Sequence, residues 1–256
     1  MKIGRFHLEG RDFYGIVEHG EVFPLAGGPY GEEIRPAGPP HRLSGLRPLP
    51  PCLPTKVVCV GLNYRDHAEE FGHGIPVEPV LFIKPSTALL GPGEGIVLPA
   101  ASERVDYEAE LAVVIGRICR KVAPEAAARY ILGYTCANDV TARDLQQRDG
   151  QWTRAKSFDT FLPLGPYIDN TVDPFNLGIS LYLNGALKQK SSTANLIFSV
   201  HELVSFISGV MTLNPGDVIL TGTPGGVGQL AAGDQVEVEI TGIGRLANSV
   251  RNEGDE

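Results

Sequence analysis

Short stretches of alternating or continuous apolar residues recur along the whole chain and predict many short β-strands. Residues 13–25 alternate around His19-Gly20, as expected of a β-hairpin. A later stretch ends at Asn184-Gly185, a dipeptide that strongly favours a two-residue hairpin turn. Further strands are predicted over residues 56–61, 111–115, 179–183, 217–221 and 235–240. Strands therefore dominate, and the pattern predicts a mixed α/β, β-rich fold.

Three segments have the residue spacing and the boundary residues of short helices. They span residues 63–71, 124–132 and 199–208. Asn63 is a suitable N-cap for the first helix, and Gly133 is a suitable stop for the second. The third has a capping box formed by Ser199 and Glu202, with Gly209 at its end. Helices are therefore few beside the strands.

Glycine and proline, with 31 and 20 copies, make up about a fifth of the 256 residues. That share is well above the usual one, while 43 % of the residues are hydrophobic, enough for a folded core. The composition favours a turn-rich folded protein and argues against helical bundles and coiled coils. Residues 26–51 are especially rich in both, and we interpret them as a linker. We therefore expect a small N-terminal hairpin domain with its linker over residues 1–50 and a larger domain over residues 51–256.

The formal net charge is −8, from 22 basic and 30 acidic residues. This balance argues against a nucleic-acid-binding protein, which normally carries a basic stripe. No apolar run approaches the roughly 20 residues of a membrane-spanning helix, and no secretory apolar segment follows Met1. We expect a soluble, cytoplasmic protein. The cysteines form no C-x-x-C pair, and we expect them to be reduced core residues: Cys52, Cys59, Cys119 and Cys136.

Asp106, Glu108 and Glu110 alternate directly before the apolar run 111–115. Residues two apart in a strand point to one face, so Glu108 and Glu110 project side by side. Carboxylates held together near the interior repel each other and need a compensating charge. A divalent cation supplies that charge, and oxygen ligands favour Mg²⁺, Mn²⁺ or Ca²⁺. The alternative is an edge strand whose acidic face is simply solvated.

A further carboxylate, Asp139, comes directly after the apolar-leaning segment 131–137. It would supply a third oxygen ligand to the same cation. Arg143 follows four residues later and carries the planar guanidinium that pairs well with a substrate carboxylate. Alternatively, this segment is a surface loop with a local Arg–Asp pair.

His67 and Glu70 are three residues apart in the first predicted helix and would share one of its faces. A carboxylate beside an imidazole raises its basicity, as a general base requires, although a plain surface pair is the alternative. Lys84 and Lys156 each lie among apolar and small residues. Solvated lysines are the usual case, but with Arg143 and a metal these two would form a cationic pocket in an acidic protein.

The glycine-rich segment 221–228 follows a predicted strand, but it has no Walker lysine and leads into no convincing helix. It is therefore a weak nucleotide-binding signal. A loop whose backbone and Thr223 hydroxyl approach a small ligand fits the sequence better.

Taken in order, these segments resemble the motifs of the fumarylacetoacetate hydrolase family over about residues 55–245. The matching segments are residues 61–64 with His67, residues 82–86, 106–111, 138–144, 155–159 and 221–224. Six motifs in a fixed order make the resemblance specific. The separate N-terminal segment makes the chain similar to the bacterial 2-hydroxyhepta-2,4-diene-1,7-dioate isomerase type of that family.

The resemblance implies rolled, mixed β-sheets with a few peripheral helices, with residues 51–256 as the catalytic domain of a homodimer. It also implies a bound Mg²⁺ or Mn²⁺, which in family members holds the carboxylate and 2-oxo group of a 2-oxo acid. The metal ligands implied for this chain are Glu108, Glu110 and Asp139.

The resemblance also implies roles for residues around the metal. His67 and Glu70 match the dyad that activates water in hydrolytic and decarboxylating relatives. We add Lys84 to the substrate-binding set, because it belongs to the predicted cationic pocket. The positions that match substrate contacts in relatives are Arg143, Gln146, Lys156 and Thr223.

Our leading expectation is an isomerase or decarboxylase of a 2-hydroxy-dienoate or 2-oxo dicarboxylate in aromatic catabolism. Lys156 would place positive charge beside the enolate that forms when a bond next to a metal-chelated 2-oxo group breaks. Protonation at another carbon gives isomerisation, loss of CO₂ gives decarboxylation, and attack by water activated at His67 gives carbon–carbon hydrolysis. The alternatives are an acylpyruvate hydrolase or oxaloacetate decarboxylase, and a metal-dependent carboxylate-binding protein without turnover.

Overall fold

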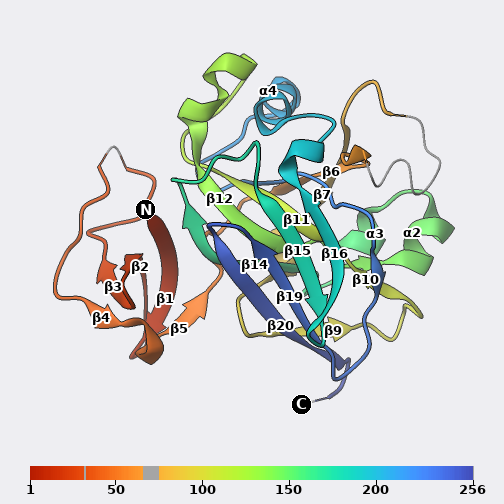
Figure 1. Ribbon diagram of the computed structural model, residues 1–256, viewed down its shortest axis with the longest axis horizontal. Coiled ribbons are helices and arrows are strands. Elements are labelled where there is room, and N and C mark those ends of the chain that lie inside the picture. The colour runs from red at the N-terminus through yellow and green to blue at the C-terminus, as the bar shows by residue number, and fades with distance from the viewer. Residues whose placement is uncertain (32, 66–74, 256) are drawn as a thin grey trace.

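The computed structural model describes residues 1–31, 33–65 and 75–255. Within these residues, most of the chain lies in mixed β-sheets, with short helices at their edges (Figure 1). The prediction of a β-rich mixed α/β fold with few helices is confirmed. No helix in the described ranges is long and apolar enough to cross a membrane.

The largest sheet runs through the whole molecule and joins strands that are far apart in the sequence. In spatial order it contains β4 (His41–Arg42), β3 (Glu21–Pro24), β2 (Arg11–Glu18), β1 (Lys2–Leu8), β14 (Leu162–Asp169), β12 (Ile131–Asn138), β11 (Ala109–Ile115), β17 (Val218–Leu220), β6 (Val57–Gly61) and β7 (Val80–Lys84). Two short strands are attached to this path: β5 (Arg47–Leu49) pairs with β1, and β8 (Leu89–Leu90) pairs with β14. Most pairs are antiparallel, but β17 with β6 and β14 with β8 are parallel.

Two smaller sheets complete the β-structure. One contains β16 (Ala186–Ser192), β15 (Gly178–Leu183), β19 (Gln235–Ile240), β20 (Gly244–Asn252) and β9 (Gly95–Leu98). The other contains β13 (Thr141–Ala142), β10 (Val105–Tyr107) and β18 (Gly228–Gln229). The five-stranded sheet packs its apolar face against β11 and β12, which places the main core between the two large sheets.

The helical segments are short. The α-helices are α2 (Arg143–Asp149), α3 (Thr153–Lys156) and α4 (Val200–Val210), and 3₁₀ helices cover Leu43–Gly45, Ser86–Ala88, Pro124–Tyr130 and Thr193–Asn195. The capping box predicted at the start of α4 is present, since Ser199 accepts from the Glu202 backbone and Glu202 accepts from the Ser199 backbone. The predicted stop at Gly209 is wrong by two residues, because the helix continues to Val210 and Met211 forms the C-cap.

The helix predicted over residues 124–132 is wrong in its last two residues. A 3₁₀ helix ends at Tyr130, and Ile131 begins strand β12. Gly133 is therefore not a helix stop but lies inside a strand. A Cβ at this position would meet the backbone oxygen of Asp169 at 2.7 Å, so glycine allows β14 to approach β12 closely. The helix predicted over residues 63–71 falls largely outside the described residues.

Both predicted hairpins are confirmed. Strands β2 and β3 pair across His19-Gly20, and β15 and β16 pair across Asn184-Gly185. The segment interpreted as a linker contains β4 and β5, which pair with β3 and β1. All four cysteines are buried and free, as predicted.

Strand β11 explains how charged groups enter the interior. All seven of its residues are buried, because Leu111, Val113 and Ile115 face one core cluster while Ala112 and Val114 face another. Such a strand has no solvated face. The acidic residues at its beginning are therefore carried into the protein by the strand itself.

Candidate metal and substrate site

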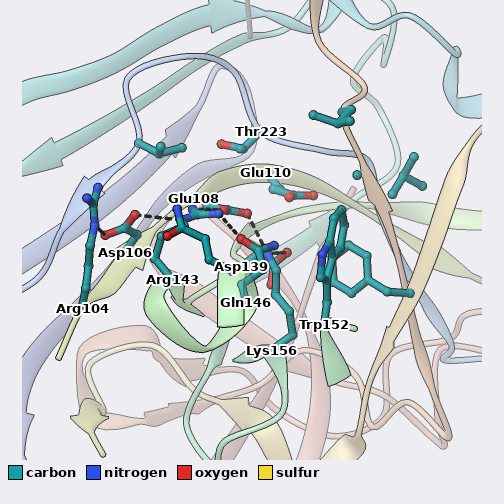
Figure 2. A pocket seen from close by; sticks show the side chains of 16 residues that line it. Arg104, Asp106, Glu108, Glu110, Asp139, Arg143, Gln146, Trp152, Lys156 and Thr223 are labelled. Atoms are coloured by element: carbon teal, nitrogen blue, oxygen red, sulfur yellow. Dashed lines mark hydrogen bonds and ion pairs between the residues drawn. The ribbon is translucent and has the colours of Figure 1, made fainter. Parts of the chain in front are cut away.

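A cavity of about 500 Å³ opens where β6, β10, β11, α2 and α3 meet. Figure 2 shows Arg104 and Asp106 at one end, Trp152 at the other, and acidic side chains between them. The lining comprises Val60, Gly61, Leu62, Phe82, Arg104, Asp106, Glu108, Glu110, Asp139, Arg143, Gln146, Gln147, Trp152, Lys156, Thr223 and Val227.

Three buried carboxylates lie at the centre of the cavity. Glu108, Glu110 and Asp139 each offer an oxygen, and these oxygens all lie within 4.8 Å of one another. The pairing of β11 with β12 creates this arrangement, since Glu110 lies opposite Ala137 and the backbone N–H of Asp139 donates to the carbonyl of Glu108 at 2.9 Å. The structure thus brings together the three carboxylates predicted to form one cluster.

Two buried lysines compensate these carboxylates. Lys156 donates from Nζ to Glu108 Oε2 at 2.9 Å and to Asp139 Oδ2 at 2.6 Å. The same ammonium lies 4.9 Å from the centre of the Phe82 ring. Lys84 donates to Asp139 Oδ1 at 2.6 Å and to the carbonyl of Val140 at 3.0 Å. Both oxygens of Asp139 are therefore fixed by ammonium groups.

Arg143 holds the outer side of the cluster. Its Nη2 donates to Glu108 Oε1, its Nε donates to Asp106 Oδ2 at 2.9 Å, and its Nη1 donates to Gln146 Oε1 at 2.6 Å. The other oxygen of Asp106 accepts from Arg104 Nε at 2.9 Å. Asp106 is fully buried and so links two arginines at one end of the cavity.

The environment moves the pKa values of the glutamates in opposite directions. Burial would raise the pKa of Glu108, but the charges and hydrogen bonds of Lys156 and Arg143 outweigh burial and lower the pKa to about 2. Burial together with the charges of Asp139 and Glu108 raises the pKa of Glu110 well above 4.5. Among the described residues, Glu110 is therefore the carboxylate of the three whose charge is least compensated.

The lysines also differ. Burial disfavours the Lys156 ammonium, but Asp139 and Glu108 outweigh burial and raise its pKa above 10.5. For Lys84, burial dominates over the attraction of Asp139 and lowers the pKa. Lys156 is consequently held as a cation beside the carboxylates and is unsuited to accept a proton.

A loop closes the cavity on the side of Thr223. The backbone N–H of Gly222 donates to Glu110 Oε2 at 2.6 Å, and Gln189 Nε2 donates to the Thr223 hydroxyl oxygen at 2.9 Å. Gly222 has a φ of +99°, a conformation that glycine adopts without strain and that aims its N–H at the carboxylate. The loop over residues 221–228 thus contacts the acidic cluster directly.

An apolar wall lies opposite the arginine end. Trp152 packs edge-on against Phe82, with ring centres 5.3 Å apart. A Cβ on Gly61 would lie 2.7 Å from Cζ3 of Trp152, so glycine at this position makes room for the indole. Val60 and Leu62 also line the cavity beside them.

Most residues predicted for the site lie around this cavity. Arg143, Gln146, Lys156 and Thr223 line it together with the three carboxylates. Lys84 does not line the cavity within the described residues but supports Asp139 from behind. The predicted dyad, His67 and Glu70, lies outside the described residues.

The sequence analysis missed Arg104, Trp152 and Gln189. Arg104 lies two residues before Asp106, so the same alternation that predicts a shared face for residues 106, 108 and 110 could have identified it. Trp152 is the single tryptophan of the chain, but nothing nearby in the sequence indicates a cavity wall. Gln189 reaches the site from β16, on a different sheet.

The donor set fits a divalent cation. Glu108, Glu110 and Asp139 offer only oxygen ligands, which suits Mg²⁺ or Mn²⁺ better than Zn²⁺. Burial, together with the negative charges of Asp139 and Glu108, raises the pKa of Glu110, so its anionic form is disfavoured beside these two carboxylates. A cation bound there would supply the missing charge.

Comparisons with known proteins identify relatives over the whole chain. A family model described as fumarylacetoacetate (FAA) hydrolase C-terminal matches residues 56–251, and one described as Rv2993c-like, N-terminal, matches residues 1–51. The structure is similar to that of 2-hydroxyhepta-2,4-diene-1,7-dioate isomerase from Mycobacterium marinum, with 45 % identity and a TM-score of 0.93 over 100 % of both chains.

Two further relatives bear other names. A mitochondrial oxaloacetate tautomerase of Rattus norvegicus is 44 % identical over 226 residues, which are 84 % of this chain and 72 % of the relative. The maleylpyruvate hydrolase of Sphingobium sp. SYK-6, solved in complex with manganese(II) and pyruvate, is 30 % identical with a TM-score of 0.82 over 98 % of this chain and 99 % of that one. The relatives thus include an isomerase, a tautomerase and a hydrolase.

Proposed function

Since the chain belongs to the fumarylacetoacetate hydrolase family, we propose that it is a divalent-metal-dependent isomerase of 2-oxo or 2-hydroxy-dienoic dicarboxylic acids. The proposed reaction moves a proton from the enol hydroxyl to carbon: to the carbon next to the 2-oxo group in keto–enol tautomerisation, and to the far end of the conjugated diene in double-bond isomerisation. The names of the isomerase and tautomerase relatives support this reaction class.

The observation that carries the proposal is the buried carboxylate cluster beside Lys156, whose ammonium donates to two of the carboxylates. Glu108, Glu110 and Asp139 would hold Mg²⁺ or Mn²⁺. Such an ion, when bound, withdraws electron density from a 2-oxo group and so acidifies the neighbouring carbon. Manganese in the maleylpyruvate hydrolase complex supports this choice of metal.

The residues of the chain would act on the substrate around that ion. Lys156 places an ammonium beside the position where negative charge develops, and its raised pKa keeps it charged. Asp139 and Glu108 hold this ammonium inside the cavity before a substrate binds. Arg143 retains one free N–H on each terminal nitrogen after its described contacts and would orient the substrate carboxylate.

The proposal is tested by following enol absorbance with metal-free and Mg²⁺- or Mn²⁺-loaded protein. We expect faster conversion of enol-oxaloacetate and of 2-hydroxyhepta-2,4-diene-1,7-dioate only with metal, and without release of CO₂. Absence of any metal-dependent change in enol absorbance across a panel of 2-oxo acids would contradict the proposal.

Carbon–carbon hydrolysis is the second candidate, and the similarity to maleylpyruvate hydrolase favours it. The same cavity would then admit a water molecule, activated at the predicted dyad His67 and Glu70. Product analysis separates the two candidates, since hydrolysis of an acylpyruvate releases pyruvate and isomerisation leaves the carbon skeleton intact. The predicted homodimer in the cytoplasm remains part of the proposal, and light scattering tests the dimer.

A further inference from the structure

We propose that Arg104 forms a second anion-binding subsite in the cavity, which takes the distal carboxylate of a dicarboxylic substrate. The inference rests on the proposed function, because it assumes that a 2-oxo acid group occupies the centre of the cavity. Arg104, to which the sequence analysis gives no role, would then determine the preference for a second carboxylate.

Arg104 has free hydrogen-bonding capacity in the right place. Its side chain lines the cavity and is 52 % exposed. Only its Nε is engaged, by Asp106 at 2.9 Å, and within the described residues neither terminal nitrogen has a partner. Arg143, by contrast, already has each of its three nitrogens engaged by a protein group and keeps only one N–H on each terminal nitrogen. Arg104 therefore offers both terminal nitrogens, the fork that binds a carboxylate with two hydrogen bonds.

The surroundings hold Arg104 in place. Its carbonyl accepts from the backbone N–H of Arg143 at 2.7 Å, so the two arginines are joined through the main chain. Asp106 is fully buried and divides its oxygens between them. Burying a carboxylate is costly, and Asp106 is not part of the metal-binding cluster. Its contacts hold two guanidinium groups side by side at this end of the cavity, and Arg143 is further paired with Glu108, whereas Arg104 pairs with Asp106 alone.

The formal charges of the site agree with a dianion. The cations Arg104, Arg143, Lys156 and Lys84 equal in number the anions Asp106, Glu108, Glu110 and Asp139. A divalent ion adds two positive charges to this neutral set. A substrate with two carboxylates restores neutrality, whereas a monocarboxylate leaves one positive charge uncompensated.

The opposite end of the cavity is unsuited to a carboxylate. Among the described residues, Trp152 packs against Phe82 and Gly61 there, and an anion placed against this apolar wall would lose its hydration with only the indole N–H of Trp152 as a donor. Figure 2 places the acidic cluster between Trp152 and Arg104. A distal carboxylate is therefore directed towards Arg104.

Calorimetry on Mg²⁺-loaded protein with chain-matched acids tests the inference. The probes are 2-oxoglutarate against 2-oxopentanoate and 2-oxoadipate against 2-oxohexanoate, which differ only in the distal carboxylate. We expect the wild type to bind at least one diacid about tenfold more tightly than its matched monoacid, and Arg104→Gln to remove this preference without weakening the monoacid. Arg148→Gln is the control, because Arg148 is 63 % exposed and does not line the cavity.

The outcomes distinguish the inference from the proposed function. If Arg104→Gln weakens diacid and monoacid equally, Arg104 acts only through Asp106, and the inference is overturned. If the wild type binds monoacids in a metal-dependent way but no diacid more tightly, the inference alone fails. If no 2-oxo acid binds with metal present, the proposed function and the inference fail together.

Discussion

The side-chain oxygen of Gln189 accepts a hydrogen bond of 2.9 Å from the backbone N–H of Ala109, the residue between Glu108 and Glu110. The amide nitrogen of the same side chain donates to the Thr223 hydroxyl oxygen and to the carbonyl of Pro224, each at 2.9 Å. One buried amide therefore connects the strand that carries the acidic cluster with the loop that closes the cavity. Because Gln189 belongs to β16, the five-stranded sheet also helps to hold the site together.

Replacement of Gln189 separates these two connections. Gln189→Ala leaves buried partners unsatisfied, and we expect a loss of about 1–3 kcal/mol in unfolding free energy and about 10–100-fold weaker metal binding. Gln189→Glu still accepts from Ala109 but loses the donor to Thr223, so substrate binding should suffer more than metal binding. Denaturant unfolding and calorimetry with Mg²⁺ measure both effects, with the exposed Gln229→Ala as control. Unchanged metal affinity in Gln189→Ala would contradict this prediction.

The two glutamates should respond oppositely to neutralisation in metal-free protein. Glu110→Gln removes a charge whose pKa is raised by burial and by Asp139 and Glu108, so the melting temperature should rise by about 2 °C or more. Glu108→Gln leaves Lys156 and Arg143 without their shared partner and should cost about 2–4 kcal/mol. Calorimetric unfolding in chelator compares them, and both variants should lose Mg²⁺ binding. Equal destabilisation by both would contradict the assigned charge states.

Lys156→Met tests the electrostatic role of the lysine. We expect kcat to fall about 10²–10³-fold, because a fixed cation beside the developing charge is lost. Metal affinity should not fall, since Lys156 competes with a metal for oxygens of Glu108 and Asp139. Lys190→Met removes an exposed lysine as the control. A kcat near that of the wild type, with weakened metal binding, would assign Lys156 to structure instead.

Gly61→Ala should push the indole of Trp152 out of its position, because the new Cβ would lie 2.7 Å from Cζ3. As Trp152 is the single tryptophan, its fluorescence reports the change directly. We expect a shifted emission maximum and a KM raised severalfold with little change in kcat. Gly209→Ala is the matched control, since a Cβ there meets nothing within 4 Å and only favours helix α4. Identical emission from Gly61→Ala and the wild type would refute the close packing.

Asp217 should make stability depend on pH. Burial would raise its pKa, but hydrogen bonds from Asn214, Lys56 and Thr55 outweigh burial and hold it below 3.8. A lowered folded-state pKa contributes stability above the unfolded-state pKa, and this contribution is lost as the pH falls through the folded-state value. Asp217→Asn should therefore cost about 2–4 kcal/mol at neutral pH and progressively less below about pH 5.

Urea unfolding at a series of pH values measures this difference for Asp217. Glu18→Gln, which removes an exposed carboxylate, should unfold much like the wild type at each pH. A deficit in Asp217→Asn that does not shrink in acid would show that the carboxylate charge is not the cause.

Local patterns in the sequence were sufficient to predict much of the site. The alternation of Glu108 and Glu110 before an apolar strand, and Asp139 after another, indicated that the carboxylates enter the interior together. The capping box at Ser199 and the hairpin at Asn184-Gly185 are equally local, and both are present. Each of these features depends on residues within a few positions of one another.

Contacts between distant strands could not be predicted in this way. Gln189 and Ala109 are 80 positions apart, and no pattern around either residue indicates the other. Gly133 has the flanking sequence of a helix stop, and only the approach of β14 explains why glycine stands there. Lys84 was predicted to line the cavity because of its charge. In the structure its ammonium binds Asp139, but the residue does not belong to the cavity lining.

The first strand of the chain, β1, covers an edge of the main sheet that would otherwise be open. Lys2 and Ile3 of β1 pair with Asp169 and Ile168 at the end of β14, whose other side pairs with β12. Without residues 1–50, this part of β14 would become an open edge with unpaired N–H and C=O groups, a template for edge-to-edge aggregation. The N-terminal segment therefore shields the end of β14, the strand next to β12, from pairing with other chains.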